Sequence, residues 1–243
     1  DYWKDIDLPQ PTKDIRVMRQ NLFEWGYCLI EDGMSQEQCQ RMRARIEEQA
    51  AAERALGIAY LVQSQQHVWS LVNKGADFVK CLEHDPQGVQ AGPIIECLLD
   101  ETLGSGWNHF SFLSNISYPN CHPQAMHQDQ TFIAPYNPRE APVLVNTMYV
   151  LEDVNEINGG TLLIPGSHKP NGNGGPYALY GAMPRPINLE AKAGTILMFD
   201  GRVLHGGAVN HSDKLRYVIT NSCVKNFIRQ QENFLLTVSA EVL

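Results

Sequence analysis

The sequence predicts an α+β protein in which a mainly helical layer at residues 1–106 packs on an antiparallel β core at residues 107–243. Apolar residues recur at helical spacing in the first third of the chain. Short stretches rich in β-branched and aromatic residues follow, separated by Pro, Gly and Asn. Several short strands at close spacing are typical of a sandwich or a barrel. We therefore expect a single domain over residues 1–243.

The first elements are expected to alternate between helix and strand. IRVMRQNLFEW predicts a helix, Gly26 ends it, and YCLIED predicts a short strand. Ser35 with Gln38 is close to a capping box and predicts a long helix that ends near Gly57. Two further short helices are expected within residues 67–85.

The β core is expected to contain a long irregular loop. The predicted strands are FSFLSNISYP, VLVNTMYVLED, GTLLIP, GTILMFDG and RYVITNSCV. Residues 168–186 are rich in Gly, Pro and Asn and have no hydrophobic period, which is typical of a functional lid or of a disordered segment. Tyr177 and Tyr180 are candidates to pack such a lid over a pocket.

Composition narrows the classes of function. The net charge of −8 argues against a nucleic-acid partner, because phosphate binding needs clustered Lys and Arg. The arginines of RMRAR predict the solvated face of a helix. No apolar run is long enough to span a bilayer, and no signal segment opens the chain, which begins at Asp1. The six cysteines form no CxxC pair, so we expect reduced thiols and a cytoplasmic protein. The oligomeric state is open, with a homodimer as one option.

The stretch MHQDQTF raises the question of a metal site. In an extended strand the side chains of residues i and i+2 point to the same side, so His127 and Asp129 would converge on one point. An imidazole and a carboxylate together suit Fe(II), Mn(II) or Zn(II). Gln128 and Gln130 would then point away from the metal. A chance His-x-Asp is common in a chain of this length, so a surface pair is the alternative.

A third candidate ligand lies further along the chain. His205 follows a predicted strand and precedes Gly206 and Gly207, which allow a close backbone approach or a sharp turn. Two histidines and one carboxylate form the facial set of non-heme Fe(II) oxygenases. Arg216 lies in the last predicted strand, where a buried guanidinium would need a carboxylate partner. An arginine on the surface of an edge strand is the alternative for Arg216.

Three segments in this order resemble one family. HQD at 127–129, NGGTLLIPGSHK at 158–169 and GTILMFDGRVLHGGAVNHSDKLR at 194–216 are similar to the phytanoyl-CoA dioxygenase (PhyH) family. The resemblance implies a double-stranded β-helix, or jelly roll, and an oxygenase that depends on Fe(II) and 2-oxoglutarate. The QQENFLLTVS tail looks most like members that modify small molecules in microbial, especially fungal, specialised metabolism.

The resemblance also implies roles for individual residues. The iron ligands would be His127, Asp129 and His205, and Arg216 would bind the distal carboxylate of 2-oxoglutarate. Three further residues are candidates for holding the cosubstrate: Gln124, Thr161 and, on a looser alignment, Gln66.

The remaining histidines are expected to have other roles. His168 is a candidate for a fourth metal ligand, but the turn residues beside it favour a structural hydrogen bond. The others are expected to be structural or surface residues: His67, His84, His109, His122 and His211.

The implied reaction is oxidation of a C–H bond in a small-molecule substrate by O₂, with release of succinate and CO₂ and with ascorbate as a supporting reductant. Hydroxylation, desaturation and ring formation are all open outcomes. Retention of Asp129 argues against a halogenase, which lacks the carboxylate ligand. Two other readings remain: a jelly-roll protein that binds a metal or ligand without turnover, and a metal-dependent hydrolase that uses the same ligands.

Overall fold

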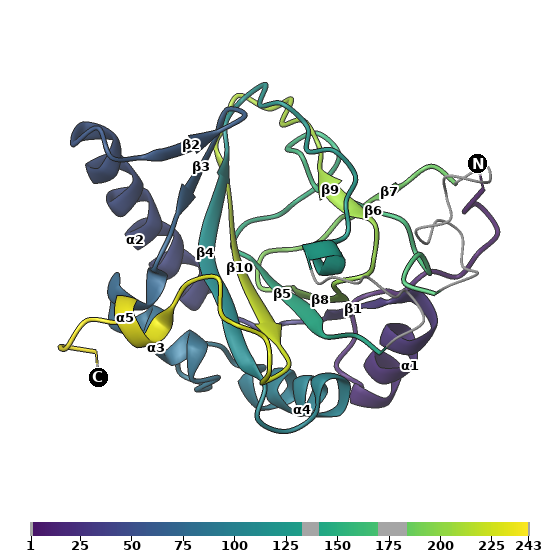
Figure 1. Ribbon diagram of the computed structural model, residues 1–243. Helices are drawn as coiled ribbons and strands as arrows, with labels where there is room; N and C mark the ends of the chain where they lie inside the picture. Colours follow the sequence, from purple (N-terminus) through teal and green to yellow (C-terminus); the bar gives the residue numbers. More distant parts are fainter. Residues whose placement is uncertain (1, 133–140, 170–183, 243) are drawn as a thin grey trace.

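The computed structural model describes residues 2–132, 141–169 and 184–242 (Figure 1). The helices and 3-10 turns of this part are α1 (Ile15–Trp25), α2 (Gln36–Ala55), η1 (Leu71–Asn73), α3 (Ala76–Leu82), α4 (Gly92–Leu103), η2 (Asp129–Phe132) and α5 (Phe234–Thr237). The strands are β1 (Tyr27–Ile30), β2 (Tyr60–Val62), β3 (Gln65–Val68), β4 (Asn108–Ser117), β5 (Leu144–Val150), β6 (Thr161–Leu163), β7 (Ile187–Asn188), β8 (Ile196–Asp200), β9 (His205–Gly207) and β10 (Arg216–Val224).

Two antiparallel sheets form the β core. The larger sheet has seven strands in the order β1-β8-β5-β10-β4-β3-β2, and the smaller has three in the order β7-β6-β9. Helices α2, α3 and α5 lie on the side of β4 and β10 away from the smaller sheet, while α4 and α1 lie at the lower end of the larger sheet in this view (Figure 1). The predicted α+β class with a two-sheet jelly-roll core is confirmed.

Period-2 alternation in the strands separates two hydrophobic layers. In β8, Ile196 and Met198 pack in the large core that includes the helices, whereas Leu197 and Phe199 belong to a second cluster with Leu163 of the smaller sheet. All four β8 side chains are almost fully buried because both faces of this strand are covered. The second cluster, which includes Leu163 of the smaller sheet, supports the site described below.

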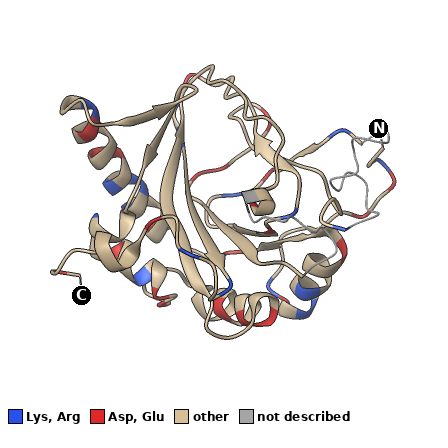
Figure 2. Cartoon of the chain, in the orientation of Figure 1, with Lys and Arg blue, Asp and Glu red and all other residues tan. Residues whose placement is uncertain are grey.

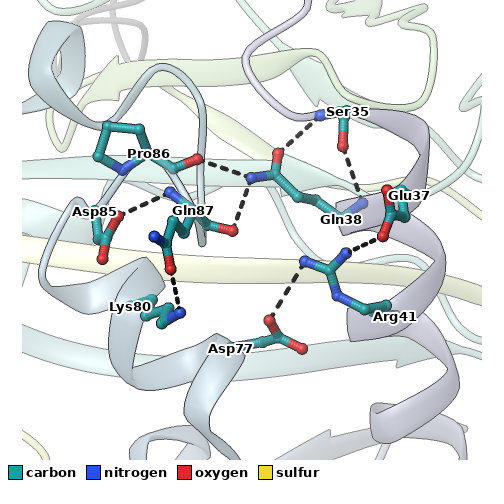
Figure 3. Close-up of polar contacts among 9 residues, drawn as sticks. All are labelled: Ser35, Glu37, Gln38, Arg41, Asp77, Lys80, Asp85, Pro86 and Gln87. Carbon is teal, nitrogen blue, oxygen red and sulfur yellow. Dashed lines mark hydrogen bonds and ion pairs between the residues drawn. The ribbon is translucent and has the colours of Figure 1, made fainter.

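Helix α2 begins at the predicted capping box and is anchored there (Figure 3). The Ser35 hydroxyl accepts a hydrogen bond from the Gln38 backbone N–H at 3.1 Å, and the Gln38 side chain accepts one from the Ser35 N–H at 2.8 Å. The Gln38 amide group also donates to the carbonyls of Pro86 and Gln87, each at 3.0 Å. One side chain therefore caps α2 and joins it to the turn that precedes α4.

The charged residues on α2 are mixed in sign (Figure 2). Arg41 forms ion pairs with Glu37 and Asp77, and Arg45 forms one with Glu48. These pairs lie on the outer side of the helix, which confirms the prediction of a solvated face.

The N-terminal third is less helical than predicted. Residues 60–68 form the β2–β3 hairpin, which extends the larger sheet. Its two-residue turn, Gln63 and Ser64, has φ values of 51° and 58°, which is the conformation that usually calls for Asn-Gly. Gln-Ser is not a typical turn sequence for a hairpin, so the local sequence did not predict the hairpin. Helix α4 was also not predicted.

Two other expectations need correction. The stretch 126–132 is extended only as far as His127, because Asp129 already begins the 3-10 turn η2. Of the predicted loop at 168–186, residues 170–183, with Tyr177 and Tyr180, lie outside the described residues.

The cysteines agree with the expectation of reduced thiols. All six are free, and each is buried except Cys97, which is partly exposed. In the part of the chain that the structure describes, no helix combines the length and apolarity needed to cross a membrane.

Gly26, between α1 and β1, is closely surrounded by other side chains. It has a φ of +79°, and a Cβ there would lie 2.5 Å from His168 Nδ1 and 2.6 Å from Val203 Cγ2. His168 in turn lies 3.1 Å, through Nε2, from the Phe23 carbonyl near the end of α1, so it has the structural role predicted but bonds to the helix.

We expect Gly26→Ala to lower the free energy of unfolding by about 1–3 kcal/mol more than Gly57→Ala, because only Gly26 has neighbours to displace. Gly57 is the matched control: its φ is +69° and nothing lies within 4 Å of its Cβ position. Urea denaturation of both variants measures the difference. Equal losses would show that the contact with His168 and Val203 relaxes freely.

Candidate metal and cosubstrate site

The three predicted metal ligands lie together at the edge of the smaller sheet. His127 and His205 form an antiparallel bridge in which each backbone N–H donates to the carbonyl of the other at 2.9 Å. Asp129 follows at the start of η2. His127 Nε2 lies 3.2 Å from Asp129 Oδ1, and His205 Nε2 lies 3.4 Å from Asp129 Oδ2. Within the described residues, the donor atoms of this triad fall within 4.8 Å of one another.

Both imidazoles are oriented by the same local contact. His127 Nδ1 lies 2.8 Å from the Ala125 carbonyl, and His205 Nδ1 lies 3.0 Å from the Val203 carbonyl, in each case two residues earlier in the chain. A carbonyl only accepts, so Nδ1 of each ring carries a proton, and Nε2 is the ring atom that faces Asp129. Each Nε2 can donate to the Asp129 carboxylate when it is protonated, and would present its lone pair to a metal ion when it is neutral.

The Asp129 carboxylate is held in its charged form. Burial would raise the pKa of Asp129, but hydrogen bonds with His127 and His205 outweigh burial and keep that pKa well below its usual range. The hydrogen bond to Asp129 correspondingly raises the pKa of His127. Asn146 Nδ2 on β5 donates to Asp129 Oδ2 at 2.7 Å, and Asn146 Oδ1 accepts from the Ser222 hydroxyl at 2.6 Å. Asn146, which was not among the predicted site residues, thus orients the Asp129 carboxylate.

Arg216 lines the same cavity as the triad. The cavity has a volume of about 200 Å³ and lies between the two sheets. Arg216 is the first residue of β10 and is 4% exposed, so the alternative of an edge-strand surface arginine is excluded. Its Nη2 donates to the Ser117 hydroxyl at 2.6 Å, while its buried Nε has no hydrogen-bond partner among the described residues. Burial lowers the pKa of Arg216, and no carboxylate among the described residues forms an ion pair with it.

Gln124 and Thr161 also reach this cavity. The Gln124 side-chain oxygen accepts from the Gly207 backbone N–H at 3.0 Å, and the Gln124 N–H donates to the Gly207 carbonyl at 2.9 Å. A Cβ on Gly206 would lie 3.0 Å from the Gln124 carbonyl oxygen, so glycine after His205 does permit the close backbone approach that was predicted. Thr161 is the first residue of β6 and pairs with Gly207.

Gln66, a candidate for holding the cosubstrate, does not line this cavity. Its side chain is fully buried away from the cavity, where it accepts from Arg54 and Tyr118 and donates to the Ala50 carbonyl of α2. Because successive side chains alternate along β3, the preceding residue, Gln65, is the one that lines the cavity. Without knowing that β3 exists, the sequence could not distinguish the two glutamines.

Gln128 and Gln130 point away from the metal ligands, as expected. Gln128 donates to the Arg202 carbonyl, and the Gln130 side-chain oxygen accepts from the Val143 N–H at 3.0 Å. Both side chains are buried, so they hold the segment that carries Asp129 against the larger sheet.

Comparison with known proteins agrees with this geometry. The profile of the family "Phytanoyl-CoA dioxygenase (PhyH)" matches residues 23–218. The chain belongs to the PhyH family.

The relatives of this PhyH-family chain include fungal proteins. It is 32% identical over 115 residues to "Dioxygenase aneA" of Aspergillus aculeatus, a match that covers 46% of this chain and 38% of the relative. It is 23% identical over 250 residues to "Dioxygenase FrzG" of Cladobotryum sp, covering 90% of this chain and 77% of the relative. The matched region thus spans about two-fifths of the length of aneA.

Solved structures share the fold of this PhyH-family chain. The carbocyclase SnoK from nogalamycin biosynthesis superposes with a TM-score of 0.66 at 18% identity, covering 90% of this chain and 88% of that one. The epimerase SnoN in complex with Fe³⁺, alpha ketoglutarate and nogalamycin RO also gives 0.66, at 17% identity, covering 87% and 83%. At this identity the likeness establishes the jelly-roll fold.

Sequence reasoning missed polar residues that line the cavity of the PhyH-family chain from the larger sheet. They share one signal, which is a polar side chain at alternating positions in an otherwise apolar strand. They are Ser111, Asn115, Asn146, Thr220 and Ser222.

We expect Asn146→Ala to weaken binding of Fe(II) or Mn(II) by about 10–100-fold, because Asp129 loses the group that orients it. Isothermal titration calorimetry under anaerobic conditions measures the affinity. Asn226→Ala, at an exposed position just after β10, is the matched control and should bind metal like the unsubstituted protein. Unchanged affinity in Asn146→Ala would show that the two histidines alone determine binding.

Proposed function

We propose that this chain is an Fe(II)- and 2-oxoglutarate-dependent dioxygenase that oxidises a C–H bond of a small molecule. One observation carries the proposal: a His-Asp-His triad and a buried arginine that forms no ion pair with the described residues line the same small cavity. The family and the relatives called dioxygenases support it.

The donor set fits Fe(II). His127 Nε2, His205 Nε2 and an Asp129 oxygen would bind one face of the ion and leave positions open for other ligands. A closed structural zinc site would normally fill four positions and favour cysteine. When bound, iron and 2-oxoglutarate supply the oxidising chemistry, with succinate and CO₂ as products.

Arg216 fits the far end of a dicarboxylate. Its Nη2 is held by Ser117, and its Nε lacks a partner, so the guanidinium is oriented before any ligand arrives. A carboxylate would satisfy the free N–H group and neutralise a charge that is otherwise costly to bury. Arg216 would thereby fix the distance of 2-oxoglutarate from the triad, with Gln124 and Thr161 beside it.

Apolar side chains complete the cavity. Leu113, Val218 and Phe199 contribute to its walls, and the Phe199 ring packs edge-on against His205 with centroids 4.7 Å apart. These residues would limit access of water to the cosubstrate and keep the His205 ring in place.

We expect His127→Ala and His205→Ala to abolish succinate formation from 2-oxoglutarate in the presence of Fe(II), O₂ and ascorbate, because each removes a metal ligand. His211→Ala is the matched control, since His211 is exposed and outside the cavity. Succinate release is measured by chromatography. Full activity in either ligand variant would overturn the assignment, and activity that needs neither O₂ nor 2-oxoglutarate would favour a metal-dependent hydrolase.

We expect Arg216→Ala to raise the KM for 2-oxoglutarate by at least about tenfold, because a buried carboxylate would lose its charged partner. Arg216→Lys should recover part of the affinity, since it restores the charge without the two parallel hydrogen bonds. Initial rates at varied 2-oxoglutarate measure KM. A KM equal to that of the unsubstituted protein would remove Arg216 from the cosubstrate site.

A further inference from the structure

A second, larger cavity meets the metal site at Asp129. It has a volume of about 680 Å³ and shares Asp129 and Ser222 with the smaller cavity, but Arg216 does not line it. Its other walls come from Phe110 of β4, Leu144 of β5 and residues 227–231, which follow β10. The size suits a small organic molecule. The two cavities therefore approach the metal ligands from different sides.

The segment that forms the outer wall is attached at both ends. At one end the Lys225 N–H donates to the Val143 carbonyl at 3.0 Å. At the other, the N–H groups of Gln231 and Glu232 both donate to the Phe110 carbonyl at 3.0 Å. Residues 225–232, which we call the strap, are thus tied to the ends of β4 and β5.

The Glu232 side chain strengthens the second attachment. It is 7% exposed, and its two oxygens accept from the backbone N–H groups of Phe112 at 2.6 Å and Ser70 at 2.9 Å. A carboxylate that accepts from two separate segments holds the strap in one position. The wall is accordingly formed before a ligand binds.

The described lining of the larger cavity has one unpaired charge, and that charge is positive. Among its described lining residues, Arg229 is the cationic side chain, and it makes no ion pair or hydrogen bond within the described part of the chain. Asp129 is the anionic one and is already engaged by His127, His205 and Asn146. The remainder is apolar or amide: Phe110, Leu144, Phe227, Ile228, Gln230 and Gln231.

We propose that this cavity binds the substrate, and that the substrate is a small molecule with one carboxylate on an otherwise apolar body. The carboxylate would pair with Arg229, and the apolar part would lie against Phe110 and Leu144, next to the metal ligands. This proposal rests on the proposed function for its reaction, but the binding it claims can be measured without turnover.

The same residues argue against a coenzyme A thioester. Coenzyme A carries several phosphate groups, and their recognition requires clustered Lys and Arg. One arginine in the described lining of the cavity matches a single carboxylate instead. We therefore infer a free acid, and not a coenzyme A thioester, as the substrate.

Calorimetric titration with three acid and amide pairs tests the proposal: phenylacetate, 2-naphthylacetate and decanoate, each against its primary amide. The protein is loaded with Fe(II) and 2-oxoglutarate under argon. We expect at least one acid to bind about tenfold or more tightly than its amide, because a partly exposed charge pair adds roughly that much. Arg229→Gln should reduce the preference to twofold or less, on the order of the margin that separates two neutral ligands.

Two further variants make the result specific. Arg229→Lys should keep most of the preference for the acid, since it retains the charge. Arg45→Gln, on the outer side of α2 where Arg45 pairs with Glu48, is the matched control and should keep all of it. Equal affinity for acid and amide, no binding of any probe, or an undiminished preference in Arg229→Gln would each overturn the proposal.

Failure of the proposed function gives a different result. If the unsubstituted protein did not bind 2-oxoglutarate, the dioxygenase assignment would fail at that step. The acid and amide titrations would then be repeated on protein without cosubstrate, where the preference for the acid and its loss in Arg229→Gln still decide what the cavity binds.

Discussion

The reciprocal pair of backbone hydrogen bonds between His127 and His205 is the constraint on which the site depends. Each is 2.9 Å long, and together they bring two distant parts of the chain into register at the edge of the smaller sheet. Because the bridge fixes both Cα positions and the Nδ1 contacts fix both rings, the two Nε2 atoms can point only toward Asp129. The chemistry of the metal ligands is therefore a consequence of backbone pairing. Gly206 serves the same pairing by letting the Gln124 backbone come close, and Gly207 leaves room for the Gln124 side chain.

The larger sheet supplies the charged side chain of Arg216 and the side chain of Asn146, which orients Asp129. Strand β10 carries Arg216 at its first residue and Ser222 near its last, so one strand contributes to both the Arg216 end and the Asp129 end of the cavity. Strand β5 supplies Asn146, which orients Asp129. These strands are central in the sheet and covered by helices on the other face, which makes them rigid supports for residues that must keep their positions.

The two cavities differ in the residues that form their walls. The smaller contains the buried Arg216 and lies between the sheets. The larger is bounded by the strap and by the ends of β4 and β5, where sequence can vary without disturbing the sheets.

The sequence by itself predicted the fold class and the main strands, and its resemblance to the PhyH family selected the triad and Arg216 as candidates. These depend on local patterns, such as alternation, glycine next to histidine and a cation inside an apolar strand, that survive without a partner segment. It could not determine Asn146, the choice of Gln65 over Gln66, or the strap as a cavity wall, because each depends on which face of a strand meets which other strand. Only the tertiary structure decided those. A one-residue step along β3 exchanges the two faces of the strand, and no local pattern in QSQQHV records which face the site lies on.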